Sequence, residues 1–321
     1  MKVNNIFLCL ASLVLFSCAK DEKIFIPDQN YSINQEVILS QIIGNPKIYH
    51  IKLGAFPFIF FGPEGSIIEI PENGLTTLNG EPVSGDIKIE FKEFSGQKSN
   101  MLSAPSTLYK GRLFDGRKLV YLNISQENES IVINEPIFIY LPENRVSPKN
   151  GFEFFEGSAD ENNNIEWRRP DGSLNMIDIS DWKVNHNEGS TIINGFKLPV
   201  HAATSWISLG SYPEPDTELK GDICVEIPHE FNSHNSLVYF IADQTNSVLK
   251  VNQNSAGDWS LCAHQILFQK GIRGKFVVIS DLGQENYFFG MTNAVLENDT
   301  NMSIKPEKRS LKEIKEALQS L

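Results

Sequence analysis

The chain has 321 residues, of which 28 are basic and 40 acidic, so its formal net charge is −12 at pH 7. A surface of that sign repels phosphate backbones, and no long cluster of Lys and Arg occurs, so the composition argues against a nucleic-acid partner. Hydrophobic residues make up 41% of the sequence, which is enough to build the cores of two domains. Short runs of Ile, Val and Phe with few helical patterns predict a mainly β protein.

The N-terminus has the pattern of a secretory signal. A single cation, Lys2, precedes an apolar run at 6–16 that is too short to span a bilayer. The residues around Cys18 then resemble a bacterial lipoprotein box, in which a cysteine is lipidated on sulfur and becomes the mature N-terminus, although Phe16 is bulkier than the family's usual residue. The resemblance implies a signal peptide at 1–17 and membrane attachment through a lipid on Cys18. Cleavage elsewhere, with Cys18 lost, is the alternative.

Three charged residues, Lys20, Asp21 and Glu22, follow the cysteine. They resemble the signal that sends lipoproteins of Bacteroidota to the outer face of the outer membrane. The resemblance implies a lipid-anchored protein at the cell surface, whereas a merely solvated tether would have the same residues and leave the protein on the inner leaflet. We interpret residues 18–45 as a tether that leads into a first strand.

The first block of predicted strands covers residues 46–142. An apolar run at 54–62 is bounded by glycines, and the run at 66–71 ends at a proline. Apolar residues then alternate with charged ones over 86–92, which predicts a half-buried strand. We expect this block to form a β-sandwich that ends at Pro142.

Two strings in this block carry a resemblance. Residues 65–71 (GSIIEIP) and 79–93 (NGEPVSGDIKIEFKE) look like a segment shared by uncharacterised surface lipoproteins of Bacteroidota, and they are distantly similar to the ZU5 β-sandwich of scaffold proteins such as ankyrins. The first similarity continues through 154–157 and 165–167. Where those lipoproteins often have a Trp followed closely by Asn-Cys-Asp, this chain has Trp206-Ile-Ser-Leu-Gly, which removes the polar cluster. The ZU5 similarity implies interaction rather than chemistry.

The remaining chain also has short strands. We expect a hairpin-rich middle segment over 143–212, followed by a linker with two prolines at 212–216. Strands at regular intervals over 217–300 predict an immunoglobulin-like or transthyretin-like sandwich. In 307–321, Ser310 is suited to cap a helix whose Leu and Ile residues share one face and pack on a sandwich. The predicted fold is thus two antiparallel β-sandwich domains, a hairpin-rich middle segment and a short C-terminal helix.

Two cysteines remain besides Cys9 and Cys18. Outside the cytoplasm Cys224 and Cys262 are able to form a disulfide. For a loop of this length the bond would stabilise the fold by roughly 4 kcal/mol, because it constrains the unfolded chain. The alternative is that both are small buried hydrophobic residues on strands.

One loop has oxygen ligands at alternate positions, as calcium sites do: Asp160, Asn162 and Asn164, with Asp171 further on. Ile165 stands where a calcium loop needs Gly, and two arginines follow, so an Asn-rich hairpin tip explains the same residues better. We expect no metal and no cofactor.

No nucleophile elbow, phosphate-binding loop or metalloprotease motif occurs. The sequence therefore favours a non-enzymatic binding or scaffold protein, with a glycan or a protein as its ligand. A glycan-binding accessory protein and a hydrolase acting on glycans are the alternatives. The four tryptophans, Trp167, Trp182, Trp206 and Trp259, would stack on sugar rings if exposed, whereas burial in a sandwich core is the commoner arrangement. Trp167, in a polar hairpin beside Arg168, is the first candidate for contact with a sugar ring.

Overall fold

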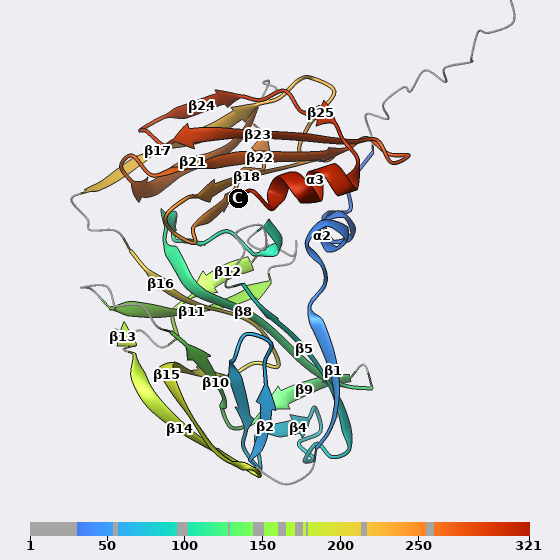
Figure 1. Ribbon diagram of the computed structural model, residues 1–321, viewed down its shortest axis with the longest axis vertical. Coiled ribbons are helices and arrows are strands. Elements are labelled where there is room, and N and C mark those ends of the chain that lie inside the picture. Colours follow the sequence, from blue (N-terminus) through green and yellow to red (C-terminus); the bar gives the residue numbers. More distant parts are fainter. Residues whose placement is uncertain are drawn as a thin grey trace, which may run out of the picture.

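The computed structural model of the protein describes residues 31–53, 57–94, 102–127, 129–143, 151–159, 165–170, 176–177, 179–212, 217–254 and 260–321. The fold is mainly β, as predicted, with two helices in these ranges. Four sheets are stacked along the long axis as two sandwiches, and both helices lie at the level where the sandwiches meet (Figure 1). Neither helix in this part of the chain is long and apolar enough to cross a membrane.

The lower sandwich contains sheets I and II. Sheet I has the strand order β1 (Lys47–Lys52), β5 (Asp86–Glu93), β8 (Asp115–Gln126), β16 (Thr204–Ser211), β11 (Phe152–Ala159), β12 (Ile165–Arg168), with β4 (Leu75–Thr77), β9 (Glu129–Ile133) and β13 (Met176–Ile177) attached. Sheet II has the order β14 (Ser180–His186), β15 (Gly189–Val200), β10 (Ile137–Pro142), β3 (Ile67–Ile70), β2 (Phe58–Phe61). The predicted alternation of β5 is present, because Ile87, Ile89 and Phe91 are buried in the core between these sheets.

The upper sandwich contains sheets III and IV. Sheet III has the order β24 (Thr300–Ser303), β17 (Glu218–Glu226), β21 (Ser260–Gln269), β7 (Arg112–Leu113), β6 (Leu108–Tyr109), and β20 (Gln253–Asn254) pairs with β21. Sheet IV has the order β19 (Val248–Lys250), β18 (Ser236–Ala242), β22 (Arg273–Asp281), β23 (Tyr287–Val295), β25 (Glu307–Lys308). Val238, Phe240 and Phe276 belong to the core between them.

Sheet IV is covered on both faces. Every residue of β18 is buried, since alternate side chains enter two different cores. Tyr239 and Ile241 point away from sheet III and share a third core with Phe155 and Trp167 of sheet I. This third core joins the two sandwiches through apolar packing.

The sheets cross the boundaries that the sequence suggested. The middle segment 143–212 is no separate unit, because β16 pairs with β8 and β15 pairs with β10 of the first block. The short β6–β7 hairpin leaves that block and joins β21 of the upper sandwich. The run of strands along the chain predicts their existence, but their partners are set by contacts distant in sequence.

A helix replaces part of the expected tether. α2 (Gln35–Ile43) begins where the Asn34 side chain accepts the Val37 backbone N–H, and it buries Ile38, Leu39 and Ile42. These residues recur three to four apart, so they share one face, which packs into the third core.

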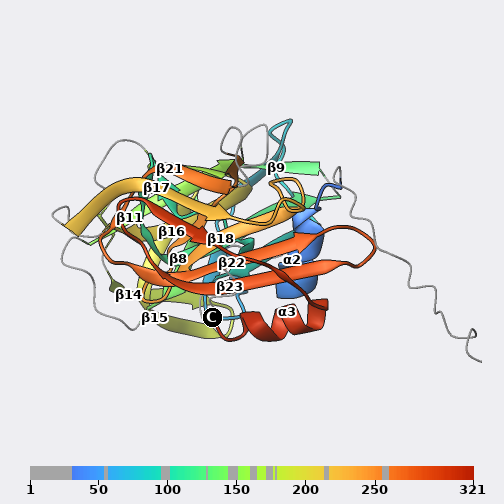
Figure 2. The same ribbon diagram turned by 90° about the horizontal axis from the view of Figure 1, so that it is seen from above.

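The C-terminal helix is confirmed. α3 (Leu311–Leu318) begins at Ser310, whose side chain and Glu313 form a capping box. Ile314 and Leu318 are buried in the third core, and α3 lies beside α2 (Figure 2). The residues before Ser310 are not helical, because Glu307–Lys308 form strand β25 on the edge of sheet IV.

Candidate functional site

Most of the sequence-predicted site residues lie outside the described residues. These are Cys18, Lys20, Asp21 and Glu22 at the N-terminus and the weak metal candidates Asp160, Asn162, Asn164 and Asp171. In the ranges that the structure covers, no group of three or more His, Cys, Asp and Glu side chains is placed to hold a metal ion.

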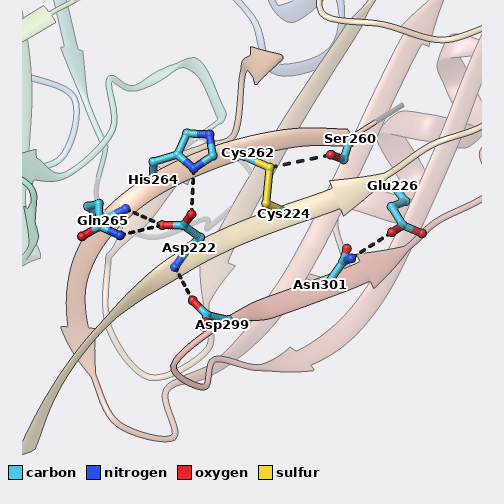
Figure 3. The surroundings of a disulfide bond; sticks show 9 residues. All are labelled: Asp222, Cys224, Glu226, Ser260, Cys262, His264, Gln265, Asp299 and Asn301. Carbon is cyan, nitrogen blue, oxygen red and sulfur yellow. Dashed lines mark hydrogen bonds and ion pairs between the residues drawn. A yellow bond between two sulfur atoms is a disulfide. The ribbon is translucent and has the colours of Figure 1, made fainter. Parts of the chain in front are cut away.

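Cys224 and Cys262 are joined by a disulfide, the bond that the sequence left open. The two residues face each other on β17 and β21, and their Cα atoms are 4.1 Å apart. Figure 3 shows polar side chains around the bond: Asp222 Oδ2 lies 2.9 Å from His264 Nδ1, and Asp222 Oδ1 accepts the Gln265 backbone N–H at 2.8 Å. The hydrogen bond to His264 is the main cause that lowers the pKa of Asp222. This network holds the two strands together where their register shifts, between Gly221 and Ile223.

Trp167 is no exposed sugar platform. The side chain is 6% exposed, and its indole N–H donates to the Ser106 carbonyl at 2.7 Å. Phe114 packs edge-on against the indole, with ring centroids 6.0 Å apart. The polar hairpin around Trp167 suggested that this residue lies at a surface. The residues that cover its indole are Ser106, just before β6, and Phe114, between β7 and β8, and both are distant from Trp167 in the sequence.

A cavity of about 1490 Å³ opens between the sandwiches, and we call it the junction groove. Its lining includes Gln35 and Leu39 of α2 and, in contact with Gln35, Lys250 at the end of β19. Tyr121 and Trp206 of sheet I line its floor. The groove thus lies beside the third core, where the apolar packing between the sandwiches ends.

The register of sheet I builds the floor. Lys92 pairs with Tyr121, and Tyr121 pairs with Trp206, so the three side chains form one row across β5, β8 and β16. The rings of Tyr121 and Trp206 have centroids 5.0 Å apart, and Phe94 lies 5.4 Å from Trp206. Both Tyr121 and Trp206 are half-buried. An aromatic surface is therefore open to the groove.

Gly157 continues this row on β11, between Trp206 and Trp167. A Cβ atom at this position would lie 2.9 Å from Trp206 Cβ and 3.1 Å from Trp167 Cζ3, distances that side chains rarely adopt. It would also lie 2.6 Å from Ile165 Cγ2. A glycine is therefore required for the two indoles to flank this strand as they do.

A second row, two residues along each strand, is polar. Glu90 pairs with Asn123, and Asn123 pairs with Thr204. Asn123 Nδ2 donates to Glu90 at 3.2 Å, and the Thr204 hydroxyl donates to Asn123 Oδ1 at 2.6 Å. Hydrogen bonding by Lys88, ahead of that by Asn123, lowers the pKa of Glu90, so this carboxylate is ionised at neutral pH. Hydrogen-bond acceptors and donors with fixed orientations thus lie beside the aromatic row.

Burial is the main cause that raises the pKa of Tyr121, and the charges of Glu90 and Glu36 add to it. The phenol therefore stays neutral and keeps its proton to donate. A general acid for glycoside cleavage needs a carboxyl with a raised pKa. Glu90 has the opposite shift, so its arrangement suits the binding of hydroxyl groups.

Sequence reasoning missed this groove. Within each strand the period of two does place Glu90 with Lys92, Tyr121 with Asn123 and Thr204 with Trp206 on one face. Which strands are neighbours, and in what register, was the missing information. Trp206 was one of four tryptophans considered for stacking on a sugar ring, but Trp167 was preferred to it, and the polar neighbours of Trp206 come from β5 and β8.

The site has to be interpreted from its own geometry, because comparison with protein-family models and with curated proteins finds no match for this sequence.

Proposed function

We propose that this chain is a lipid-anchored protein of the bacterial cell surface that binds a carbohydrate in the junction groove. The observation that carries the binding part is the pair of half-buried rings, Tyr121 and Trp206, with the hydrogen-bonded row of Glu90, Asn123 and Thr204 beside it.

A sugar ring presents two kinds of surface to a protein. Its C–H face is apolar and stacks on an aromatic ring, and its hydroxyl groups need donors and acceptors at the rim. Trp206 and Tyr121 supply the first, while Glu90 and Thr204, which line the groove and are held by Asn123, supply the second. The volume of about 1490 Å³ has room for several sugar units, since small-ligand sites are commonly 300–1,000 Å³.

The anchoring part rests on the sequence. The lipoprotein box ending at Cys18 implies attachment to a membrane, and Lys20, Asp21 and Glu22 imply export to the outer face of the outer membrane. A net charge of −12 and the lack of a long Lys/Arg cluster argue against the extended phosphate contacts of nucleic-acid binding, and we consider glycans and proteins as partners.

The anchor is tested by growing cells with a clickable fatty acid. The wild-type protein should be labelled and should remain with the outer membrane, and a Cys18→Ser variant should be unlabelled. Replacing Lys20, Asp21 and Glu22 by Ala should protect the protein from a membrane-impermeant reagent on intact cells. A wild-type protein without the fatty-acid label would contradict the lipid anchor. Equal surface labelling of the wild type and the Ala variant would contradict the role of residues 20–22 in export.

The binding site is tested with the detergent-solubilised full chain on a panel of oligosaccharides. Hits should lose at least tenfold in affinity on Trp206→Ala, which corresponds to about 1.4 kcal/mol. The matched control is Trp182→Ala, because that indole is also half-buried, bonded to the Gly195 carbonyl at 3.2 Å, and lies on sheet II away from the groove. Equal losses in both variants, or no hits, would contradict the proposal.

The same panel separates binding from hydrolysis. Glu36 and Glu90 both act on Tyr121, so the groove does contain two carboxylates. If the protein only binds, incubation of each hit releases no new reducing ends. Release that is lost on Glu90→Gln would instead identify a hydrolase.

A further inference from the structure

The geometry points to an acidic carbohydrate, with carboxylate or sulfate groups on successive units, as the ligand of the junction groove. This inference rests on the proposed carbohydrate function and adds the charge of the ligand. It is carried by two half-buried lysines, Lys92 and Lys250, that line the groove and contact neutral oxygen atoms.

Lys92 extends from β5 toward the end of α2. Its ammonium donates to the Gly44 carbonyl at 3.2 Å and to the Ser103 hydroxyl at 2.9 Å, and it lies 5.1 Å from the centre of the Phe94 ring. An ammonium group has three N–H donors, so one remains for a ligand beyond these two contacts. Within the described ranges Lys92 forms no ion pair.

Lys250 lies at the other end of α2. Its ammonium donates to Gln35 Oε1 at 2.6 Å, and the Gln35 amide nitrogen donates to the Tyr239 hydroxyl at 3.1 Å. The bond to Tyr239 fixes the orientation of the amide, so that its oxygen faces Lys250. No carboxylate from the described part of the chain pairs with Lys250 either.

The groove's two carboxylates, Glu36 and Glu90, pair with neither lysine. Glu90 instead pairs with Lys88 and accepts a hydrogen bond from Asn123. In a chain with 40 acidic and 28 basic residues, two half-buried ammonium groups facing neutral oxygens are unusual. Burial lowers the pKa of both lysines, and no nearby carboxylate offsets this effect. An anionic ligand would supply the missing charge.

Helix capping explains only one of the two. Lys92 meets the C-terminal end of α2, where the helix dipole favours a cation. Lys250 instead meets Gln35, the first residue of the helix, where the same dipole disfavours a cation. A ligand that fits both positions is a simpler account than two separate structural roles.

The separation of the two lysines indicates an oligomer. They contact residues 35 and 44, and a helix rises 1.5 Å per residue, so they lie on the order of 14 Å apart along α2. A ligand with a single charge is too short to meet both ammonium groups. A chain of acidic sugar units reaches both while one ring stacks on Trp206.

The test compares chemically matched glycans by calorimetry on the detergent-solubilised full chain. Oligogalacturonates are compared with the same oligosaccharides after carboxyl reduction, and oligosaccharides of a sulfated galactan, which has no carboxylate, with their desulfated forms. We expect at least tenfold tighter binding of the acidic member of one pair, weaker binding at higher salt, and a tenfold loss on Lys92→Met or Lys250→Met. The first pair reports a carboxylate and the second a sulfate.

The matched control is Lys197→Met. That lysine is also half-buried, 3.9 Å from the centre of the Phe138 ring, and lies on sheet II outside the groove. Lys92→Arg and Lys250→Arg keep the charge and should retain binding, which separates charge from damage to α2. Equal binding of acidic and neutral members, unchanged by the Met variants, would overturn this inference and leave the carbohydrate function standing. If the protein binds none of these glycans and none in the wider panel, both the acidic ligand and the carbohydrate function are overturned.

Discussion

Trp167 and Trp206 stand on either side of Gly157 in one row of sheet I, yet one is part of a core and the other lines a groove. Trp167 is 6% exposed, and its indole N–H is satisfied by the Ser106 carbonyl. Trp206 is half-buried, and its ring faces Tyr121 and Phe94 in the junction groove. The same residue type on the same face of a sheet is therefore buried in a core or open to a groove according to what covers it, and binding is our proposal for the open one.

The junction between the sandwiches shows the same contrast on a larger scale. In its closed part Phe114, Phe155 and Tyr239 are fully buried in apolar packing. In its open part Lys92, Tyr121 and Lys250 line a cavity, together with residues of α2, the helix at the level where the sandwiches meet (Figure 1). The closed part holds the sandwiches together, so the open part is free to present polar and aromatic groups to a ligand.

The largest expected effect is on the closed side. Trp167→Ala should lower the free energy of unfolding by about 3–5 kcal/mol, because it leaves a cavity and an unsatisfied Ser106 carbonyl. Urea unfolding followed by circular dichroism measures the change. Trp206→Ala, measured in the same way, should cost less than half as much. Equal losses would mean that the two tryptophans are not distinguished by burial.

A change at Gly157, between Trp167 and Trp206, should affect both stability and ligand binding. Gly157→Ala should lower the free energy of unfolding by about 1–3 kcal/mol, because the added methyl group clashes with Ile165 and both indoles. It should also weaken ligand binding, since Trp206 has to shift. The control is Ala202→Gly at an exposed position, which should leave binding unchanged and lower the free energy of unfolding by at most about 0.4–1 kcal/mol through added chain entropy. Unchanged stability and binding in Gly157→Ala would show that the row is loosely packed.

A smaller effect is expected from pH. Burial lowers the pKa of Lys92 to about 8, against about 10.5 in the unfolded chain, so the folded state loses this proton first. Between these values the unfolded state binds more protons, and the contribution of Lys92 to stability rises with pH. The groups near Lys92 do not reverse this rise of stability with pH, because neither changes its charge in this range. Tyr121, whose pKa is raised, stays neutral up to about pH 10, and Glu90, whose pKa is lowered, is ionised throughout.

The wild type should therefore gain stability relative to Lys92→Met between pH 7.5 and 9.5, while its affinity for an acidic glycan should fall over the same range. Denaturant titrations and calorimetry at the two pH values measure these opposite changes. Parallel pH profiles for the two proteins would contradict the role given to Lys92.

Local patterns in the sequence predicted those elements that their own residues identify without knowledge of their packing partners. The alternation over 86–92 gave β5, and the spacing of Ile314 and Leu318 after Ser310 gave α3. The weak pattern before Ile42 hid α2, whose apolar face becomes evident only when the third core is present. The helix was taken for a tether because nothing near it in the sequence showed what it would pack against.

The candidate site lay beyond such reasoning for a similar reason. Lys92, Tyr121 and Trp206 come from strands that are far apart in the sequence, and only the register of sheet I brings them into one row. Trp167 was the first candidate for a sugar contact because its own hairpin is polar, but Ser106 and Phe114 bury it, which is the commoner arrangement for a tryptophan in a sandwich. In an antiparallel sheet the period of two assigns a face to each residue, and the contacts across that face are set by tertiary structure.

The most direct test of the account follows the indole N–H resonances of the full chain in detergent during titration with an oligosaccharide that binds it, with assignments from Trp→Phe variants. We predict that the Trp206 resonance shifts in proportion to ligand occupancy, while the resonance of Trp167, bonded to Ser106, stays in place. A shift at Trp182 or Trp167 with none at Trp206 would contradict the claim that the junction groove is the binding site.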